Sequence, residues 1–188
     1  MINLAQSFGA RRVLVTGGAG FVGSAVTRRL VDAGAQVTVL DDLFTGQAEA
    51  VPTGADFIEG SVTDTELVDE LVAANSLVFH LAARNIIAST TNPRDDFATN
   101  IGGTLNILLA ARASKVDRIV YTGSASVYGN PRSIPINEDD FLVPLSPYAV
   151  SKLGGENYAQ AFYESFGLPT ACVRYSNVFG PGQRPDNP

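Results

Sequence analysis

The chain has 188 residues, 45% of them hydrophobic, and a formal net charge of -6. This size favours one well-buried domain over two. The 13 Lys and Arg residues are scattered and do not form the basic cluster that a nucleic-acid surface needs. No apolar stretch approaches the roughly 20 residues that cross a bilayer, and residues 1–12 lack the pattern of a secretory signal. We therefore expect a cytoplasmic protein whose partner is a small molecule, with no nucleic-acid and no membrane partner.

Short β-branched runs alternate along the chain with longer segments that have apolar residues at three-to-four spacing. The expected strands are 12–16, 36–40, 56–58, 77–81, 118–122 and 170–175. The expected helices are 21–33, 64–73, 93–114 and 147–166. Because the strands are apolar on both faces, this alternation predicts an α/β fold with a parallel sheet that is covered by helices on both sides.

Capping residues support the start of the last helix. Ser146 stands at an N-cap position and Pro147 at the first helical position, so the helix begins just before Tyr148. The preceding segment, 129–147, contains four prolines and three acidic residues, and we expect a long polar loop that folds over a ligand.

The single cysteine and the single histidine do not predict a metal site. Cys172 lies in an apolar run, where we expect a buried and inert thiol. His80 has no second His or Cys at the spacing of metal ligands.

A glycine-rich turn follows the first expected strand. The segment 17–23 places Gly17, Gly20 and Gly23 between a strand and a helix, where the backbone can approach a pyrophosphate and the helix N-terminus meets its charge. Asp41 and Asp42 follow the second strand, roughly 20 residues further on, where an acid binds the adenosine ribose and repels a 2′-phosphate. Glycines alone mark many strand-to-helix turns, and Asp alone marks many loops, but their combination predicts a dinucleotide site. The acid at its end predicts that the dinucleotide is NAD rather than NADP.

Tyr148 and Lys152 lie one turn apart on the last expected helix, and Ser124 lies upstream. Tyr ionises near pH ~10, so positive charge from Lys152 and an oxidised nicotinamide is needed to make it a base. Tyr148 would then take the proton from a substrate hydroxyl that Ser124 holds in line. The alternative is a chance pair on an amphipathic helix, with Tyr in the core and Lys in solvent.

The sequence resembles the extended short-chain dehydrogenase/reductases, in particular the NAD-dependent nucleotide-sugar epimerase/dehydratase group. The resemblance rests on six segments in order: residues 16–23 (TGGAGFVG), Asp41, residues 80–83 (HLAA), 100–104 (NIGGT), 123–129 (GSASVYG) and 174–182 (RYSNVFGPG). It covers essentially the whole chain.

The resemblance implies a Rossmann-type doubly wound sheet with NAD across it and with Ser124, Tyr148 and Lys152 as catalytic residues. The further cofactor-binding residues that it implies are Gly17, Gly20, Phe21, Val22, Asp41, Asp42, Ser61, Val62, Leu81, Ala82, Ala83 and Asn100. The further substrate-binding residues that it implies are Arg84, Ser126, Asn177 and Arg184. Where the family usually has Asp-Ile or Asp-Val beside the adenine, this chain has Ser61-Val62, which is either a weaker base contact or a variant without consequence.

The resemblance also implies a domain plan and a partner. Residues 1–177 would form the NAD-binding domain, and residues 178–188 would begin the connection to a small C-terminal substrate domain that is largely absent from this chain. Two subunits would form a homodimer by pairing the Asn100 and Tyr148 helices.

The two residues after Ser124 discriminate among reactions. Related dehydratases have Asp-Glu there and related decarboxylases have a Glu at the second position, whereas this chain has Ala125-Ser126. We therefore expect 4-epimerisation of a UDP-sugar, with a decarboxylase, a dehydratase, a net dehydrogenase and a catalytically silent NAD-binding module as alternatives. Residues 184–186 (RPD) resemble a segment of UDP-glucuronate 4-epimerases in which the arginine meets the uronate carboxylate, although a solvated loop arginine explains Arg184 equally well.

Overall fold

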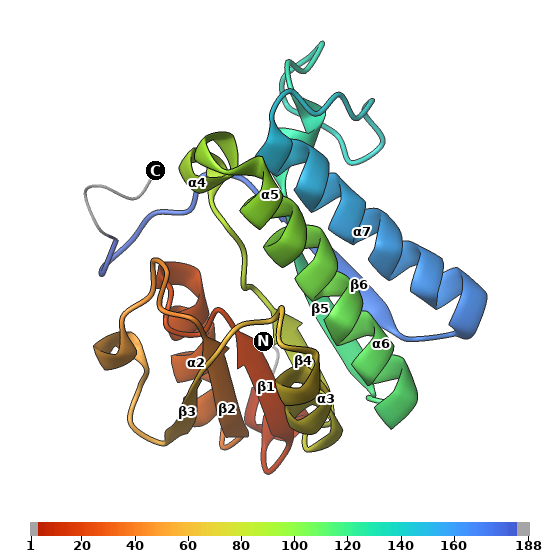
Figure 1. The fold of residues 1–188 in the computed structure, drawn as a ribbon. Helices are drawn as coiled ribbons and strands as arrows, with labels where there is room; N and C mark the ends of the chain where they lie inside the picture. The colour runs from red at the N-terminus through yellow and green to blue at the C-terminus, as the bar shows by residue number, and fades with distance from the viewer. Residues whose placement is uncertain (1–3, 184–188) are drawn as a thin grey trace.

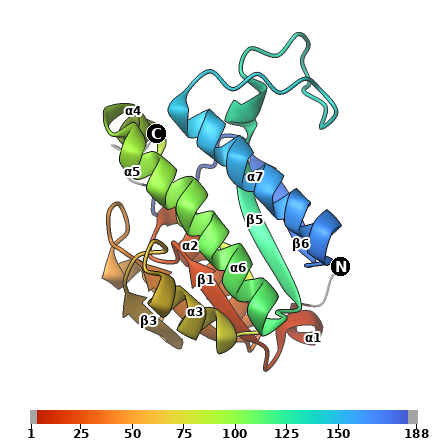
Figure 2. The ribbon, with the colours of Figure 1, turned by 45° about the vertical axis from the view of Figure 1, so that its right-hand side comes forward.

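The computed structural model describes residues 4–183, which form one sheet with helices on both faces (Figures 1 and 2). The strands are β1 (Arg12–Thr16), β2 (Gln36–Asp41), β3 (Ala55–Glu59), β4 (Leu77–His80), β5 (Arg118–Ser124) and β6 (Thr170–Tyr175). The α-helices are α1 (Leu4–Phe8), α2 (Phe21–Asp32), α3 (Thr65–Ala73), α4 (Ile86–Thr91), α5 (Pro93–Asp96), α6 (Thr104–Ser114) and α7 (Pro147–Phe166). A π-helical segment, η2 (Phe97–Gly103), and two 3-10 turns, η1 (Ala48–Ala50) and η3 (Ala125–Tyr128), complete the elements.

The strands have the order β3-β2-β1-β4-β5-β6 and are all parallel, which confirms the doubly wound Rossmann-type fold. The chain winds outward from β1 to β3 and then crosses back to place β4 on the other side of β1. In open parallel sheets, ligands bind at this reversal, beyond the carboxyl ends of the two strands. Thr16 and His80 end β1 and β4 side by side, so they mark this position.

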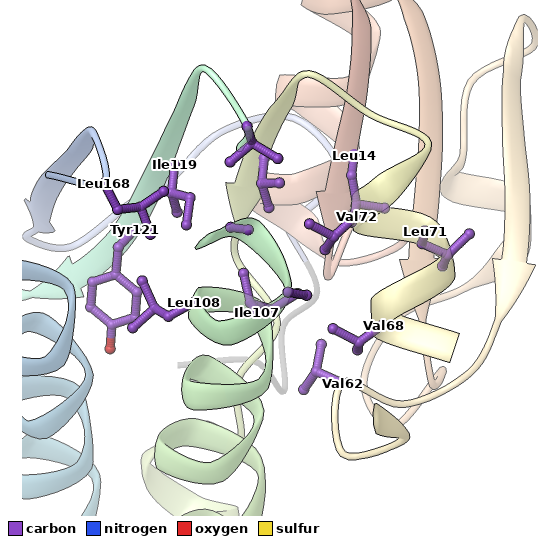
Figure 3. Close-up of a cluster of buried hydrophobic side chains, with 14 of the residues drawn as sticks. Leu14, Val62, Val68, Leu71, Val72, Ile107, Leu108, Ile119, Tyr121 and Leu168 are labelled. Carbon is purple, nitrogen blue, oxygen red and sulfur yellow. The ribbon is translucent and has the colours of Figure 1, made fainter. Parts of the chain in front are cut away.

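The alternation of side chains along β1 divides the core between the two faces of the sheet. Leu14 packs into a cluster under α3, α6 and α7, whereas Val13 and Val15 pack with Leu30 of α2 on the opposite face. Figure 3 shows the first cluster, in which Ile107 of α6 and Val72 of α3 approach the sheet. Both faces of β1 are therefore buried, as the sequence predicts.

Capping residues end the helices as expected. Ser146 accepts a hydrogen bond from Ala149 N with Pro147 in the first turn, and Gly167 ends α7 in a left-handed conformation with φ of 68°. The segment before α7 contains no helix or strand from residue 129 to residue 146, which confirms the long loop. This loop projects beyond the end of the sheet in Figure 1.

The expected single helix 93–114 is interrupted by the π-helical segment η2. A β-carbon at Gly103 would lie 2.4 Å from Val62 Cγ2, so this glycine lets η2 approach the loop after β3. The wider turn also directs Asn100 into the protein interior. Hydrophobic spacing did not reveal it, because the apolar positions continue through the segment, and it did not reveal the short α1 and α4.

The expectation of a buried Cys172 is wrong, because the residue is exposed. β6 is the edge of the sheet, and no further strand pairs with it within residues 4–183. An apolar run alone does not distinguish an edge strand from a central one. Among the helices of these residues, none is both long and apolar enough to span a membrane.

Candidate active site

The glycine turn brings the backbone of β1 against the segment that follows β4. Gly17 has φ of 72°, and a β-carbon there would lie 2.6 Å from Ala82 N. Gly23, in the first turn of α2, is packed so closely that its β-carbon would lie 2.0 Å from Gly17 O. Within the described chain, no side chain caps the N-terminus of α2, where Gly20 is the N-cap. The first N–H groups of α2 are thus available to an anion.

Asp41 lies beside this turn at the end of β2. Its two carboxylate oxygens accept hydrogen bonds from Ala19 N and Leu43 N, both at 2.9 Å. Burial raises its pKa, and these two donors oppose the effect. A pocket beside it is lined by residues at or just after the ends of β1, β2, β3 and β4, and by one residue of η2: Gly17, Gly20, Leu40, Asp41, Asp42, Phe44, Thr45, Gly60, Val62, Leu81, Ala82, Ala83, Arg84 and Thr99.

Arg84 lines the same pocket rather than standing free. Its Nη1 donates to Asp42 at 2.8 Å, its Nε donates to Asp95 at 2.6 Å, and the guanidinium lies 4.1 Å from the centre of the Phe44 ring. These two carboxylates raise its pKa against the effect of burial. The guanidinium thus already has two carboxylate partners within the chain.

A buried hydrogen-bond chain through His80 joins β1, β4 and η2. The hydroxyl of Thr104 donates to Asn100 O at 2.6 Å, so its oxygen accepts from His80 Nε2 at 3.0 Å. His80 Nδ1 then accepts from the hydroxyl of Thr16 at 2.7 Å. Burial, and secondarily the charge of Lys152, lowers the pKa of His80 to about 3, so the ring is neutral. His80 therefore holds the strand ends together, a role that its position in the sequence did not indicate.

Ser124, Ser126 and Tyr148 meet at the end of β5. Ser126 Oγ donates to Ser124 Oγ at 2.9 Å, and the Ser124 hydroxyl lies close enough to the Tyr148 phenol to lower its pKa. The pKa of Tyr148 is raised in this structure, because burial of the phenol outweighs the effect of Ser124. The structure thus brings the expected serine and tyrosine together, but it does not show the expected lowering of the tyrosine pKa by Lys152.

Lys152 is buried one turn after Tyr148, on the side of α7 that faces β5. Its Nζ lies 4.6 Å from the centre of the Tyr121 ring, and the Tyr121 hydroxyl donates to Lys152 O at 3.1 Å. Gly155 makes room for that hydroxyl, since a β-carbon there would lie 2.3 Å from it. Burial lowers the pKa of Lys152 to about 8. The lysine is therefore not the solvated residue that a chance pair would contain.

Arg174 fixes the long loop and α7 to the edge strand. Its guanidinium donates to Glu156 at 2.6 Å and to Glu138 O at 3.1 Å, and it also contacts the Tyr128 hydroxyl. Glu156 and Tyr128 raise its pKa. Sequence reasoning placed Arg174 only within a motif and did not identify this contact.

Other expected site residues lie apart from the pocket or are not described. The Phe21 and Val22 side chains line an apolar hollow of about 460 Å³ between α1, α2 and the segment after β6. Ser61 Oγ is hydrogen-bonded to Thr63 Oγ1 at 2.9 Å, and Asn177 is exposed after β6. Arg184 lies outside the described residues. Within residues 4–183, no three His, Cys, Asp or Glu side chains gather as metal ligands.

These features are suited to binding a dinucleotide cofactor and, next to it, a substrate that carries a hydroxyl group. The glycine turn is packed so tightly that β-carbons at Gly17 and Gly23 would clash with neighbouring backbone, and the N-terminus of α2 that follows it has no side-chain cap. The carboxylate of Asp41 stands beside one end of the pocket, as an acceptor for ribose hydroxyls. A phenol, a serine hydroxyl and a buried amine lie beyond it, as groups that bind and deprotonate a hydroxyl.

Comparisons with known proteins give the same picture. The chain is 37% identical over 178 residues to the UDP-glucose 4-epimerase of Azospirillum brasilense, an alignment that covers 93% of this chain and 51% of that enzyme. The structure of the Thermus thermophilus UDP-glucose 4-epimerase in complex with NAD matches with a TM-score of 0.88 and 39% identity, over 94% of this chain and 58% of that one. The Thermotoga maritima UDP-glucose 4-epimerase with UDP-glucose matches with a TM-score of 0.90 and 35% identity, over 94% and 59%.

This chain spans about half the length of the relatives that it matches. A sequence model described as the NAD dependent epimerase/dehydratase family matches residues 13–188. The match confirms the resemblance and the NAD cofactor expected from the glycine turn and Asp41. The chain belongs to the NAD dependent epimerase/dehydratase family.

Proposed function

We propose that this chain carries the cofactor-binding and catalytic part of an enzyme that epimerises a UDP-sugar at C4. The observation that carries the proposal is the Tyr148 phenol, which lies near Ser124 at the end of β5, with the buried Lys152 one turn further along α7. The relatives named as UDP-glucose 4-epimerases support it.

The cofactor would lie across the carboxyl ends of β1 and β4. Gly17, Gly20 and the N-terminus of α2 would hold its pyrophosphate, Asp41 its adenosine ribose and Lys152 its nicotinamide ribose. When bound, NAD supplies an acceptor that takes a hydride from a carbinol carbon and gives it back.

The proton steps fall to the side chains of this chain. Tyr148 as the phenolate would take the proton from the 4-hydroxyl of the sugar, and the phenol would return it once the sugar has presented its other face. The Ser124 hydroxyl would hold the reacting oxygen in line. Because burial raises the pKa of Tyr148, phenolate formation depends on the positive charge of Lys152 and of the oxidised cofactor.

The residues around Ser124 favour epimerisation over the alternatives. Ala125 and Ser126 bring no carboxylate that would assist water elimination, and Ser126 Oγ instead donates to Ser124. The test is incubation of the full-length protein with UDP-glucose or UDP-glucuronate without added NAD, with products identified by NMR. We expect the 4-epimer alone. Accumulation of NADH or release of CO2 would exclude epimerisation.

We propose that the substrate is a neutral UDP-hexose rather than UDP-glucuronate. Arg84 already pairs with Asp42 and Asp95, so it is a poor candidate for a uronate carboxylate. Arg184 is the remaining candidate. If the substrate is the uronate, Arg184→Ala should raise its KM by ~10-fold or more, the value of a lost charge-assisted contact. If Arg184→Ala leaves the KM for UDP-glucuronate unchanged and the wild type turns over UDP-glucose efficiently, the neutral sugar is supported.

We propose the domain plan with residues 1–177 as the NAD-binding domain and residues 178–188 as the start of a connection. On this plan the 188 residues alone bind NAD but turn over little UDP-sugar, because a substrate domain would supply half of the nucleotide site. NAD titration and the NMR assay on the same sample check this. Turnover by the 188 residues at the rate of the full-length protein would contradict it.

We also propose a homodimer formed through η2, α6 and α7. Phe97, Leu109 and Val150 on these elements are 62%, 48% and 52% exposed. The helices α6 and α7 lie side by side on one face of the sheet (Figure 2). Analytical ultracentrifugation of wild type and Leu109→Glu tests this. We expect a dimer that the added charge disrupts, and a monomeric wild type would exclude it.

A further inference from the structure

One buried carboxylate in the structure has no role in the proposed mechanism. Asp96, at the end of α5, is 3% exposed, and its Oδ1 accepts hydrogen bonds from three different elements. Ser89 Oγ of α4 donates at 2.6 Å, Asn100 Nδ2 of η2 at 2.6 Å and Ser151 Oγ of α7 at 2.9 Å. A buried carboxylate requires such donors, because its desolvation is otherwise costly.

The contact with α7 falls within the turn that joins Tyr148 to Lys152. Ser151 directly precedes Lys152, and its Oγ lies 2.9 Å from Asp96 Oδ1 and 3.0 Å from Tyr148 O. The ionised oxygen of Asp96 is the stronger acceptor of the single hydroxyl proton. Asp96 therefore fixes the rotation of α7 at the point from which both side chains project.

The same carboxylate is connected to the cofactor pocket. Asn100 Nδ2, which donates to Asp96, also lies 3.1 Å from Arg84 O, while Asn100 Oδ1 accepts from Arg84 N at 2.7 Å. Arg84 directly follows the Leu81–Ala83 segment that lines the pocket. One network thus links α7 to the segment after β4.

The charge of Asp96 acts on both members of the pair. It raises the pKa of Lys152 against the effect of burial, together with weaker effects of Cys172 and Glu156. It also raises the pKa of Tyr148, to which burial contributes more and against which Ser124 acts.

Two further titratable groups near Lys152 carry no charge at neutral pH: burial lowers the pKa of His80 to about 3 and raises the pKa of Tyr121, whose ring lies 4.6 Å from Lys152 Nζ.

We propose that Asp96 is a positioning residue for the Tyr148–Lys152 pair: through Ser151, its buried carboxylate orients the α7 turn that carries both side chains and places a negative charge beside that turn. The inference rests on the proposed function for its catalytic meaning. Its physical content concerns the ionisation of two side chains and can be measured without turnover.

The charge is tested by Asp96→Asn, which keeps the shape and an acceptor oxygen. The ionisation of Tyr148 is followed by ultraviolet absorbance as pH is varied, with NAD bound and no sugar present. The absorbance of the Tyr148→Phe variant is subtracted from that of the wild type, and the same subtraction is made in the Asp96→Asn background. Removal of the Asp96 charge should lower the Tyr148 pKa, because that charge raises it in the wild type. Glu164→Gln, an exposed neutralisation on the same helix, should leave the titration unchanged.

In the epimerase assay, Asp96→Asn should move the whole pH profile of kcat to lower pH. The acid limb moves because the Tyr148 phenolate forms at lower pH, and the alkaline limb moves because Lys152 loses its proton at lower pH. A merely structural residue would lower kcat without moving either limb. Unmoved limbs and an unmoved Tyr148 titration, in a variant that still binds NAD, would overturn the charge role.

The orientation role is tested by Ser151→Ala, which removes one donor and leaves the carboxylate in place. We expect kcat to fall by ~10-fold with KM unchanged and the limbs in their wild-type positions. A wild-type kcat would overturn the orientation role, and this variant decides the matter if Asp96→Asn does not fold. If wild type epimerises no UDP-sugar, the proposed function fails, while the Tyr148 titration still supports or overturns the role of Asp96.

Discussion

The two regions that meet at the end of the sheet are built in different ways. The turn between β1 and α2 depends on missing side chains, since Gly17 and Gly23 leave no room for a β-carbon. The region between β5 and α7 depends on buried polar side chains, among them Asp96, Asn100 and Lys152. Damage to the first region should therefore act on cofactor binding through shape, and damage to the second should act on proton transfer while the cofactor stays bound.

The largest expected effect lies in the second region. Tyr148→Phe keeps the ring and removes the phenol hydroxyl whose pKa the nearby Ser124 lowers. Turnover of UDP-sugar should fall by ~10²- to 10⁴-fold, the contribution of a positioned acid-base group, with bound NAD unchanged. Initial rates and the cofactor content of the purified protein check both parts. Tyr163→Phe, an exposed tyrosine on the same helix, is the matched control; if both variants turn over at equal rates, Tyr148 is not the base.

Lys152 gives the second prediction, because burial holds its pKa at about 8 in the folded protein, below its ordinary value of 10.5. Between these two pH values the unfolded chain binds a proton that the folded chain does not, so the free energy of unfolding rises with pH. The gain that Lys152 contributes approaches ~3 kcal/mol above pH 10.5 and is lost as pH falls through about 8. The free energy of unfolding of cofactor-free wild type and of Lys152→Met is measured in urea at several pH values from about 8 to 10.5. The difference between the two plots of this free energy against pH gives the contribution of Lys152. If the free energy of unfolding of both proteins changes with pH in the same way, the lysine is not desolvated.

In the first region, Gly23→Ala tests whether shape alone is responsible. The added β-carbon would lie 2.0 Å from Gly17 O, so α2 must move away from the turn. We expect a loss of ~1–3 kcal/mol of stability, the usual cost of overpacking, and weaker NAD binding. Gly102→Ala is the control, since its nearest contact would be 3.8 Å. Thermal unfolding and NAD titration compare the two, and equal effects would show that the close approach at Gly23 is not what matters.

Asp41→Asn tests the carboxylate that is hydrogen-bonded to the glycine turn through Ala19 N. The amide keeps an acceptor for Ala19 N or Leu43 N but loses the charge, so the affinity for NAD should fall by ~10-fold and the preference over NADP should narrow. Isothermal titration with both dinucleotides measures this. Asp56→Asn on β3, where the side chain is exposed, controls for net charge. A preference for NAD that survives in Asp41→Asn would assign the discrimination to another group.

The same contrast explains what could be predicted from the sequence. The strands, the glycine turn and the Ser124, Tyr148 and Lys152 set are carried by local patterns or by motifs, and the structure brings them together. Asp96 was not predicted, because its partner Ser151 is 55 positions away and nothing local distinguishes Asp96 from Asp95. The His80 chain was missed for the same reason, and η2 was missed because its apolar spacing resembles that of the helices around it.

The smallest expected effect concerns Cys172, which lies on the edge strand β6 outside both regions. Exposure suggests a reactive thiol, but partial burial of the sulfur atom and the nearby charge of Glu156 raise its pKa to about 11, so the thiolate is scarce at neutral pH. Because a more basic thiolate is also a stronger nucleophile, the net slowing of alkylation relative to free cysteine should be ~10-fold. Mass spectrometry of iodoacetamide labelling over time measures the rate, and Cys172→Ala should bind NAD as wild type does. Labelling at the rate of free cysteine would mean that the sulfur atom is as solvated as the rest of the residue and that burial does not raise its pKa.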